Sequence, residues 1–440
     1  MTATPRRLST FAPAFKRISL ALLLLSTLLI FAYPSVGKPL WQLFQLSASV
    51  YLFANLQKKP LFAPGLLFLA ALVVQGISWY ASIIQHPEYA ETSLKVQRLG
   101  NWFSFILVAW VLKDTPKWIW FTWILGLIGL LLVPWTQGNG WAEFQNSAIF
   151  ARSSFGFTNA EHAGMLYGAG LIGLLVLSGR WFRRSFTSKK PLALARITVC
   201  IALIVYCATL VLLAETRAIF VGLLAAFIVI GILLVSQLRR FSWQKLLASA
   251  AAVCIVLVAL IASTSNYSQL LPKRWQQEIP TITAALNGNY AAIANDSAGI
   301  RLKSWLAASE WIQQRPLTGW GGSGRGLVMQ HLDSLPLEIK KQFRHLHNSY
   351  LDTLVNYGSL GGVLLLLLHG YFAVASWKAW RLGKAPGDVS LFSCAFLAYW
   401  LVVNFFESYL FYTSGTTLLA LTAGGIIAFY WQQITNPQIA

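Results

Sequence analysis

Long apolar segments separated by short polar ones run through almost the whole sequence. A helix needs about 20 apolar residues to cross a lipid bilayer, and the pattern predicts about twelve such helices. Their expected ranges are 18–33, 39–56, 61–84, 99–113, 116–134, 159–179, 194–214, 217–236, 245–263, 349–376, 389–408 and 415–432. Prolines stand at several of the ends, among them Pro34, Pro60 and Pro116, as expected for helix boundaries. The sequence therefore predicts an all-α polytopic membrane protein.

The composition supports this class. Of the 440 residues, 56% are hydrophobic and only 11% are charged, whereas soluble domains carry roughly a quarter charged residues. The basic segment 1–20 precedes an apolar run without a small-residue cleavage site, so we expect a retained first span. No CxxC or Cys/His spacing occurs, which predicts neither a disulfide nor a zinc site. The four cysteines, all in apolar runs, are Cys200, Cys207, Cys254 and Cys394.

The net charge of +20 follows the predicted topology. Most of the 34 basic residues fall in alternate connections on one side of the predicted membrane, where Asp114 and Asp388 are the acids. Basic connections face the cytoplasm, so both termini are expected there. The charge is then a topology signal and not a nucleic-acid footprint, and no nucleic-acid partner is expected.

The same orientation divides the chain into three parts. Residues 1–263 hold the first nine spans, 264–348 form one long periplasmic loop, and 349–440 hold the last three spans. Within the loop a helix is expected over 298–314, started by Asp296 and Ser297 and stopped before a proline. The glycine-rich run 315–326 lacks the Gly-Lys-Ser/Thr ending of a phosphate-binding loop and predicts a tight structural turn.

The stretch RHLHNSYLDTLVNYGSLGG at 344–362 gathers titratable and polar residues where a helix enters the membrane. It contains His345, His347, Asn348 and Tyr350. Polar residues at such a place are costly and favour a functional site. The alternative is decoration of the water–lipid interface, where Tyr and His are comfortable.

Charged residues recur at the other predicted outer helix ends. Arg217 joins two apolar runs, and Arg301 opens the loop helix with Trp305 one turn on. Two arginines can bind a diphosphate bidentately. The alternatives are snorkelling of Arg217 or pairing with Glu215, and simple solvation of Arg301.

Two carboxylates complete the set of candidates. Glu161 either lines a site or caps its helix, whereas Glu407 has no basic neighbour in sequence, which favours function. The outer acids are dispersed and no DxD occurs, so no metal is expected.

Three motifs in chain order resemble the O-antigen ligase and polymerase superfamily: ETRA with Arg217, RLKSWLAASEWIQQRPLTGWGGSG with Arg301, and HNSYLDTLVNYGSLGG with His347. The resemblance covers about 213–363 and is closest to the ligase. It implies a GT-C-like fold without metal or cofactor in the bacterial inner membrane. The implied reaction, at the periplasmic face, transfers O-antigen from undecaprenyl diphosphate to the lipid A-core oligosaccharide. In-line attack would invert the anomeric carbon.

By motif position, the resemblance implies that Arg217 and Arg301 bind the diphosphate and that His347 is the catalytic histidine, while a family carboxylate matches Glu407 loosely. If the helix starts before the histidines, His345 and His347 lie roughly 200° apart, and only one faces the cavity. This favours His347 as the base and His345 as a bystander.

Five further side chains are expected to contact substrate or line the site, namely Glu407, Glu161, Asn348, Trp305 and Tyr350. Two related enzymes share these motifs, O-antigen polymerase and protein O-oligosaccharyltransferase. A transporter of the same lipid is the alternative outside enzymes, although no repeated halves are visible.

Overall fold

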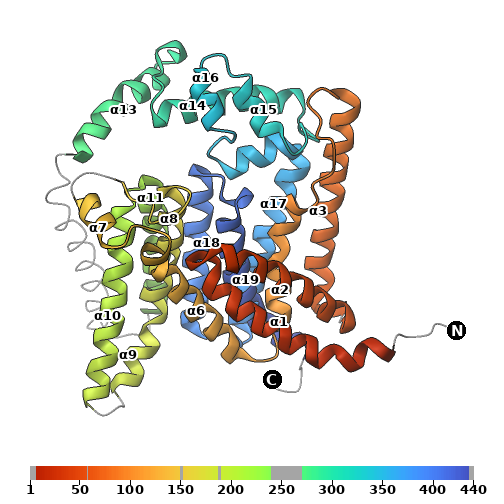
Figure 1. Cartoon of the computed structure of the whole chain (residues 1–440), viewed down its shortest axis with the longest axis vertical. Helices are drawn as coiled ribbons and strands as arrows, with labels where there is room; N and C mark the ends of the chain where they lie inside the picture. Colours follow the sequence, from red (N-terminus) through yellow and green to blue (C-terminus); the bar gives the residue numbers. More distant parts are fainter. Residues whose placement is uncertain (1–5, 57, 149–151, 187–189, 239–269, 436–440) are drawn as a thin grey trace.

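The computed structural model describes residues 6–56, 58–148, 152–186, 190–238 and 270–435 (Figure 1). Within these ranges every regular element is a helix. The N-terminal half holds α1 (Arg6–Ala32), α2 (Pro34–Ala54), α3 (Lys58–Gln85), α4 (Gln97–Gly100), η1 (Asn101–Phe103), α5 (Ser104–Leu112), α6 (Pro116–Thr136), α7 (Trp141–Ala148), α8 (Ala160–Leu177), α9 (Gly179–Phe186), α10 (Lys190–Leu213) and α11 (Arg217–Leu238). The C-terminal half holds α13 (Leu270–Leu286), η3 (Tyr290–Ala292), α14 (Ser297–Gln314), α15 (Gly324–Gln330), α16 (Leu337–Gln342), α17 (Ser349–Arg381), α18 (Gly387–Phe406), η4 (Tyr409–Phe411) and α19 (Thr413–Thr435).

Nine helices in the described ranges are long and apolar enough to cross a membrane. They confirm the predicted class of polytopic α-helical membrane protein. The nine stretches are Pro13–Ala32, Pro60–Gln85, Pro116–Thr136, Ala160–Phe182, Lys190–Leu213, Arg217–Val235, Ser349–Arg381, Gly387–Phe406 and Thr413–Gln432. Two expected spans, 39–56 and 99–113, are not among them, and the expected span 245–263 lies outside the described residues.

The segment 99–113 is broken into α4, η1 and α5, and only the nine residues of α5 form a regular α-helix of any length. Almost every side chain of α5 is buried. The segment is surrounded by protein and not by lipid, so it does not need the length or regularity of a lipid-exposed span. Hydropathy alone could not distinguish this buried core segment from a membrane span.

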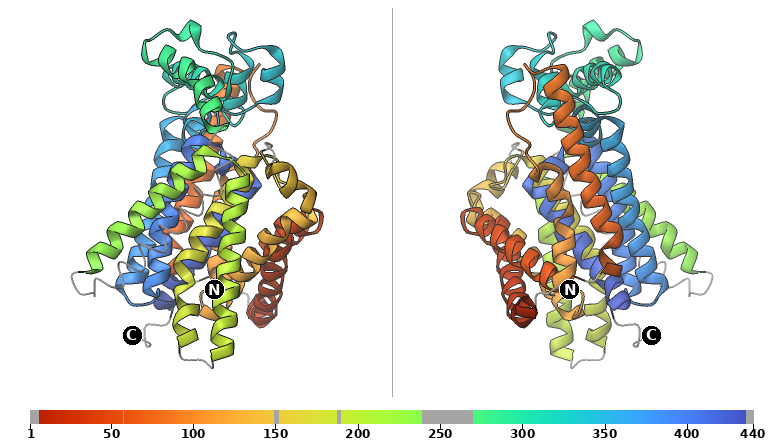
Figure 2. Two further views of the ribbon diagram at one scale, coloured as in Figure 1. Left: turned by 90° about the vertical axis from the view of Figure 1, so that its left-hand side faces the viewer. Right: turned by 90° about the vertical axis from the view of Figure 1, so that its right-hand side faces the viewer.

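The segment 39–56 does form a helix, α2, which packs along α1 (Figure 2). Polar side chains face its neighbours: Ser19 of α1 donates a hydrogen bond to Ser47 at 3.1 Å, and Gln45 donates to Ser104 at 3.0 Å. Interhelical hydrogen bonds between small polar residues suit helices that pack on protein. Gln45 and Ser47 lower the hydropathy of α2, which is not one of the nine candidate spans.

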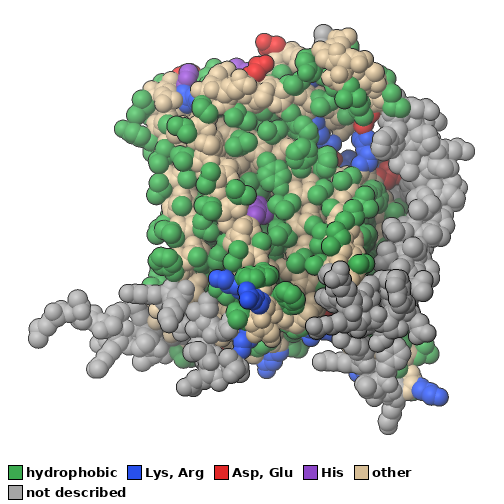
Figure 3. Space-filling model, turned by 180° about the vertical axis from the view of Figure 1, so that it is seen from behind, with side chains coloured by type: hydrophobic (Ala, Val, Ile, Leu, Met, Phe, Trp, Pro, Cys, Tyr) green, Lys and Arg blue, Asp and Glu red, His purple; other side chains and the backbone are tan. Residues whose placement is uncertain are grey.

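At the centre of the bundle, α19 packs closely on α5. A Cβ built on Gly424 would lie 2.6 Å from the Cβ of Val108, so only glycine allows this approach. The outer surface of the bundle carries a broad belt of hydrophobic side chains, with Lys and Arg gathered near one end (Figure 3). The belt is the surface expected to face lipid.

Helices α13–α16, which we call the loop layer, cover the other end of the bundle (Figure 1). The predicted loop helix is confirmed as α14, whose N-cap Asp296 accepts a hydrogen bond from Gly299 N–H at 2.7 Å. The glycine-rich run docks on α17, where Trp320 N–H donates to the Val355 carbonyl at 2.9 Å. Gly358 kinks α17 with a φ of 59° at this contact. The run is therefore a structural turn, as predicted.

Candidate active site

The two histidines lie in an irregular segment that ends at the N-cap of α17. The side chain of Asn348 accepts hydrogen bonds from the N–H groups of Tyr350 and Leu351, at 2.9 and 3.1 Å, and so starts the helix. His347 itself has a φ of 50°, in the left-handed region. The expectation that helical geometry places His345 and His347 on opposite faces is therefore wrong, because both precede the helix.

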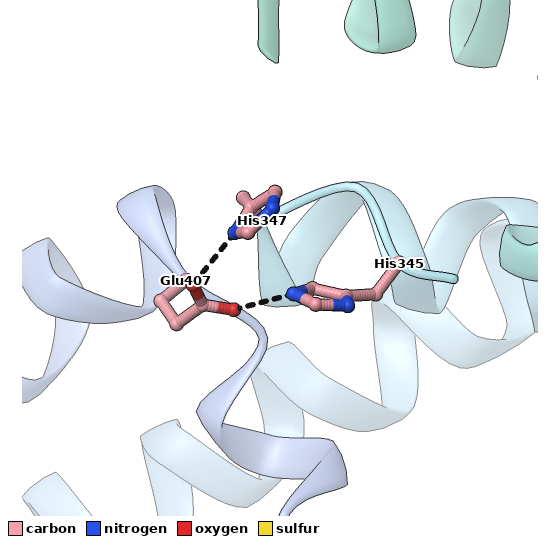
Figure 4. Close-up of side chains that lie close together, drawn as sticks. All are labelled: His345, His347 and Glu407. Carbon is pink, nitrogen blue, oxygen red and sulfur yellow. Dashed lines mark hydrogen bonds and ion pairs between the residues drawn. The ribbon is translucent and has the colours of Figure 1, made fainter. Parts of the chain in front are cut away.

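Both imidazole rings instead meet one carboxylate, that of Glu407 (Figure 4). His347 Nδ1 lies 2.7 Å from Glu407 Oε2, and His345 Nε2 lies 3.0 Å from Oε1. Glu407 follows the last residue of α18 in an extended conformation, and its Oε1 also accepts the Ser408 N–H at 2.8 Å. The expectation that His345 is a bystander at the interface is thus contradicted by its contact with Glu407.

Glu407 is fully buried, while His345 and His347 are 9% and 8% exposed. Burial would raise the pKa of Glu407, but the hydrogen bonds and positive charge of the two histidines hold that pKa well below its ordinary value. The carboxylate is therefore ionised at neutral pH. A buried anion between two imidazoles fixes the orientation of both rings.

The two rings differ in their second nitrogen. Since His347 Nδ1 donates to Glu407, the neutral ring carries its lone pair on Nε2, for which no hydrogen-bond partner is found in the described part of the chain. His345 presents its Nδ1 to the Tyr412 hydroxyl at 3.1 Å. His347 is thus the ring with a nitrogen available to accept a proton.

Backbone contacts of Leu346 hold both histidines in place. Its carbonyl accepts a hydrogen bond from Trp305 Nε1 at 2.7 Å, and its N–H donates to Asp352 Oδ1 at 3.0 Å. Asp352 is fully buried and pairs with Arg325 at 2.8 Å. Trp305, a predicted site residue, therefore reaches the site through the backbone. Arg325 was missed by the sequence reasoning because it lies in the glycine-rich turn, which carried no sequence signal for a site.

A third histidine lies beside this group. His162 of α8 contacts Ser414 Oγ through Nδ1 at 2.5 Å. Its ring lies edge-on to Tyr412, with 4.8 Å between ring centroids. Tyr412 therefore links His162 to His345. The sequence assigned His162 and Tyr412 no role in the site, because nothing in their local sequence connects them with residues 345–347.

The predicted arginines are placed with carboxylates at the loop-layer end of the bundle. Arg217, the first residue of α11, forms a bidentate ion pair with Glu278 of α13. In this pair the distance from Nη2 to Oε1 is 2.6 Å. Arg301 Nη2 lies 3.6 Å from Glu161 Oε1. Glu161 also contacts Arg152 at 2.8 Å.

One backbone contact joins these arginines to the histidine group. The buried hydroxyl of Tyr409 donates to the Glu161 carbonyl at 2.9 Å. Tyr409 stands two residues after Glu407. Arg301 and Trp305 also occupy adjacent turns of α14, so this helix carries one arginine and the group that holds the histidine segment.

Two predicted substrate contacts already serve the fold. The Asn348 oxygen caps α17, and the Tyr350 hydroxyl donates to the Leu401 carbonyl of α18 at 2.7 Å. A substrate contact would therefore have to use other polar atoms of these two residues, such as the Asn348 side-chain nitrogen.

His345, His347 and Glu407 also form a group that could hold a metal ion, because their ligand atoms lie within 4.8 Å of one another. Two imidazoles and a carboxylate suit a transition metal in type. However, tetrahedral zinc would hold its ligand atoms roughly 3.3 Å apart, given metal–ligand distances of about 2.0–2.1 Å. The nitrogen–oxygen distances of 2.7 and 3.0 Å suit direct pairing better.

The family model described as O-Antigen ligase matches residues 202–366. The match includes Arg217, Arg301 and both histidines, whereas Glu407 and Glu161 lie outside it. No curated protein matches the chain. This match confirms the resemblance seen in the three sequence motifs, and over residues 202–366 it supports membership of the O-antigen ligase superfamily.

Proposed function

We propose that this protein is an O-antigen ligase of the bacterial inner membrane. It transfers O-antigen from undecaprenyl diphosphate to the lipid A-core oligosaccharide at the periplasmic face. The observation that carries the proposal is the buried pair of His347 and Glu407, which leaves His347 Nε2 with a lone pair. Family membership supports glycosyl transfer from a lipid-linked glycan, and the pair supplies the base that such a transfer needs.

In the proposed reaction a hydroxyl oxygen of the acceptor sugar attacks the anomeric carbon of the donor, and the bond from that carbon to the phosphate oxygen breaks. His347 Nε2 takes the hydroxyl proton, and Glu407 stabilises the imidazolium and holds its orientation. Undecaprenyl diphosphate leaves with the bonding electron pair. In-line attack inverts the anomeric configuration.

The leaving group already carries negative charge, so it needs cations more than a proton. Arg217 and Arg301 fulfil that need in the proposal, since guanidinium groups bind phosphate oxygens bidentately. The reaction then needs no metal and no cofactor. Transfer at an unchanged rate in excess chelator is the expected result.

Reconstitution tests this function. The purified protein, in vesicles with lipid-linked O-antigen and lipid A-core but no nucleotide, is expected to produce ligated lipopolysaccharide, whereas His347→Ala is not. Elongation of the donor glycan without ligation would identify a polymerase instead. Glycosylation of an added acceptor protein would identify a protein O-oligosaccharyltransferase. Movement of the donor across the membrane without transfer would identify a transporter.

A further inference from the structure

Arg152 contacts the segment just before Arg217 and shares a carboxylate partner with Arg301. Its Nε donates to the Ala214 carbonyl at 3.2 Å, three residues before Arg217. Its Nη2 lies 2.8 Å from Glu161 Oε1, the oxygen that Arg301 also approaches. No sequence motif singles out Arg152, which stands in the connection between α7 and α8.

Two guanidinium groups thus converge on one carboxylate oxygen, which pairs closely with Arg152 and leaves Arg301 poorly satisfied. Arg301 reaches that oxygen only at 3.6 Å, and its Nε is buried without a hydrogen-bond partner among the described residues. An unpaired buried donor on a cation is costly. A phosphate group offers several oxygens where Glu161 offers one within reach of both side chains.

The exposed fractions differ between the two kinds of partner. The side chains of Arg152 and Arg217 are 31% and 40% exposed, whereas Glu161 and Glu278 are 15% and 12% exposed. An incoming anion therefore meets the guanidinium groups before the carboxylates. The space-filling view shows basic side chains at a hollow below the loop layer, with acidic ones near them (Figure 3).

We propose that Arg152 is a third anion-binding arginine of the donor site, and that Glu161 occupies the place of a phosphate group until a polyprenyl diphosphate displaces it. The inference rests on the proposed function and extends its pair of arginines, Arg217 and Arg301. In the same way, Glu278 occupies the place of a phosphate group beside Arg217. Internal carboxylates keep the three cations paired in the resting protein and lower their affinity for a bound anion by competition.

An ordinary structural ion pair would behave differently. If Arg152 and Glu161 only fasten α8 in place, removing either charge lowers stability and leaves anion affinity nearly unchanged. If Glu161 competes with a phosphate, Glu161→Gln tightens anion binding while Arg152→Ala weakens it. The two variants of one ion pair then shift affinity in opposite directions, which a structural role does not produce.

The test measures binding of farnesyl diphosphate to the purified full-length protein in neutral detergent, with inorganic pyrophosphate as a second probe. We expect Arg152→Ala to weaken farnesyl diphosphate binding roughly 10- to 100-fold, the range for a hydrogen bond to a charged group. Glu161→Gln is expected to tighten binding several-fold. Pyrophosphate is expected to compete with the lipid, since the shared diphosphate makes the contacts.

Arg180→Ala and Asp388→Asn are the matched controls, because this pair has comparable chemistry between α9 and α18, and neither is expected to change affinity. Unchanged binding in Arg152→Ala beside weakened binding in Arg217→Ala would overturn the inference and leave the proposed function standing. No saturable binding by wild type, or no effect of Arg217→Ala and Arg301→Ala, would overturn both. If Arg152→Ala does not fold, Glu161→Gln decides: tighter binding supports the inference, and equal or weaker binding overturns it.

Discussion

His347 Nδ1 lies 2.7 Å from Glu407 Oε2, although the two residues are 60 positions apart in the sequence. His347 precedes α17 and Glu407 follows α18, so the loop-layer ends of two long helices meet at this contact. The pair leaves the opposite ring nitrogen of His347, Nε2, with a lone pair that can accept a proton.

The two histidines are expected to contribute unequally. His347→Ala should reduce the transfer rate about 10²–10⁴-fold, the usual loss of a positioned base. His345→Ala should cost less, about tenfold, because it removes only one of the groups that hold Glu407. Single-turnover rates of both purified variants measure this. A larger loss in His345→Ala than in His347→Ala would reverse the assignment.

Glu407 is expected to make stability fall at acid pH. In the folded protein its pKa is held well below the ordinary value. The ionised carboxylate therefore contributes its full stabilisation above the ordinary pKa of a glutamate, near pH 4–5. That stabilisation is lost as the pH falls towards the lower pKa of the folded state. The melting temperature of wild type should therefore drop more steeply below about pH 4 than that of Glu407→Gln. Equal slopes for the two proteins would contradict an ionised Glu407 in the fold.

The same shift leaves Glu407 ionised throughout pH 5–8. Any acid loss of the transfer rate within that range is then expected to come from a group other than this carboxylate. The pH–rate profile checks this, with Glu407→Gln lowering the plateau at all pH values within the range.

Trp305 is expected to act on the rate through Leu346. Trp305→Phe keeps the ring but removes the N–H that donates to the Leu346 carbonyl, so the histidine segment loses one of its supports. We expect kcat to fall several-fold while KM for the donor stays nearly constant. A matched change at Trp377→Phe, far along α17, should leave both constants unaltered. A change confined to KM would instead place Trp305 against the donor.

Lysine is expected to replace Arg217 poorly. Arg217→Ala should abolish transfer while the protein still inserts in the membrane, and Arg217→Lys should restore little, because a single ammonium cannot form the bidentate contact. Arg301→Lys should behave in the same way. Near-wild-type turnover in both lysine variants would exclude the proposed role in binding diphosphate.

The proposed topology predicts which end of the bundle faces the periplasm. Ser334, in the loop layer, and Leu382, after the far end of α17, are separated by a helix of 33 residues, which is about 50 Å long. In a cysteine-free background, an impermeant thiol reagent should label Ser334→Cys but not Leu382→Cys in intact spheroplasts. Labelling of Leu382→Cys alone would invert the topology.

The sequence by itself determined the membrane class, the helix α14 and the residues of the family motifs. These are properties of short stretches: hydropathy over about 20 residues decides whether a helix can cross a bilayer, and caps and prolines decide where a helix starts and stops. The segment 99–113 is not the single long helix that hydropathy predicts, because a buried core segment and a lipid-facing segment have similar hydropathy.

Only the tertiary structure decided how the site is assembled. It brought His345 to Glu407 beside His347, placed Arg217 on Glu278, and added Arg152, Arg325 and His162, which carry no local signal. Except for the contact of Arg152 with Glu161, these contacts join elements far apart in the chain, so they depend on how whole helices pack. The left-handed turn at His347 is held by hydrogen bonds of the Leu346 backbone to Trp305 and Asp352. These partners come from other elements, so no local sequence pattern encodes the turn.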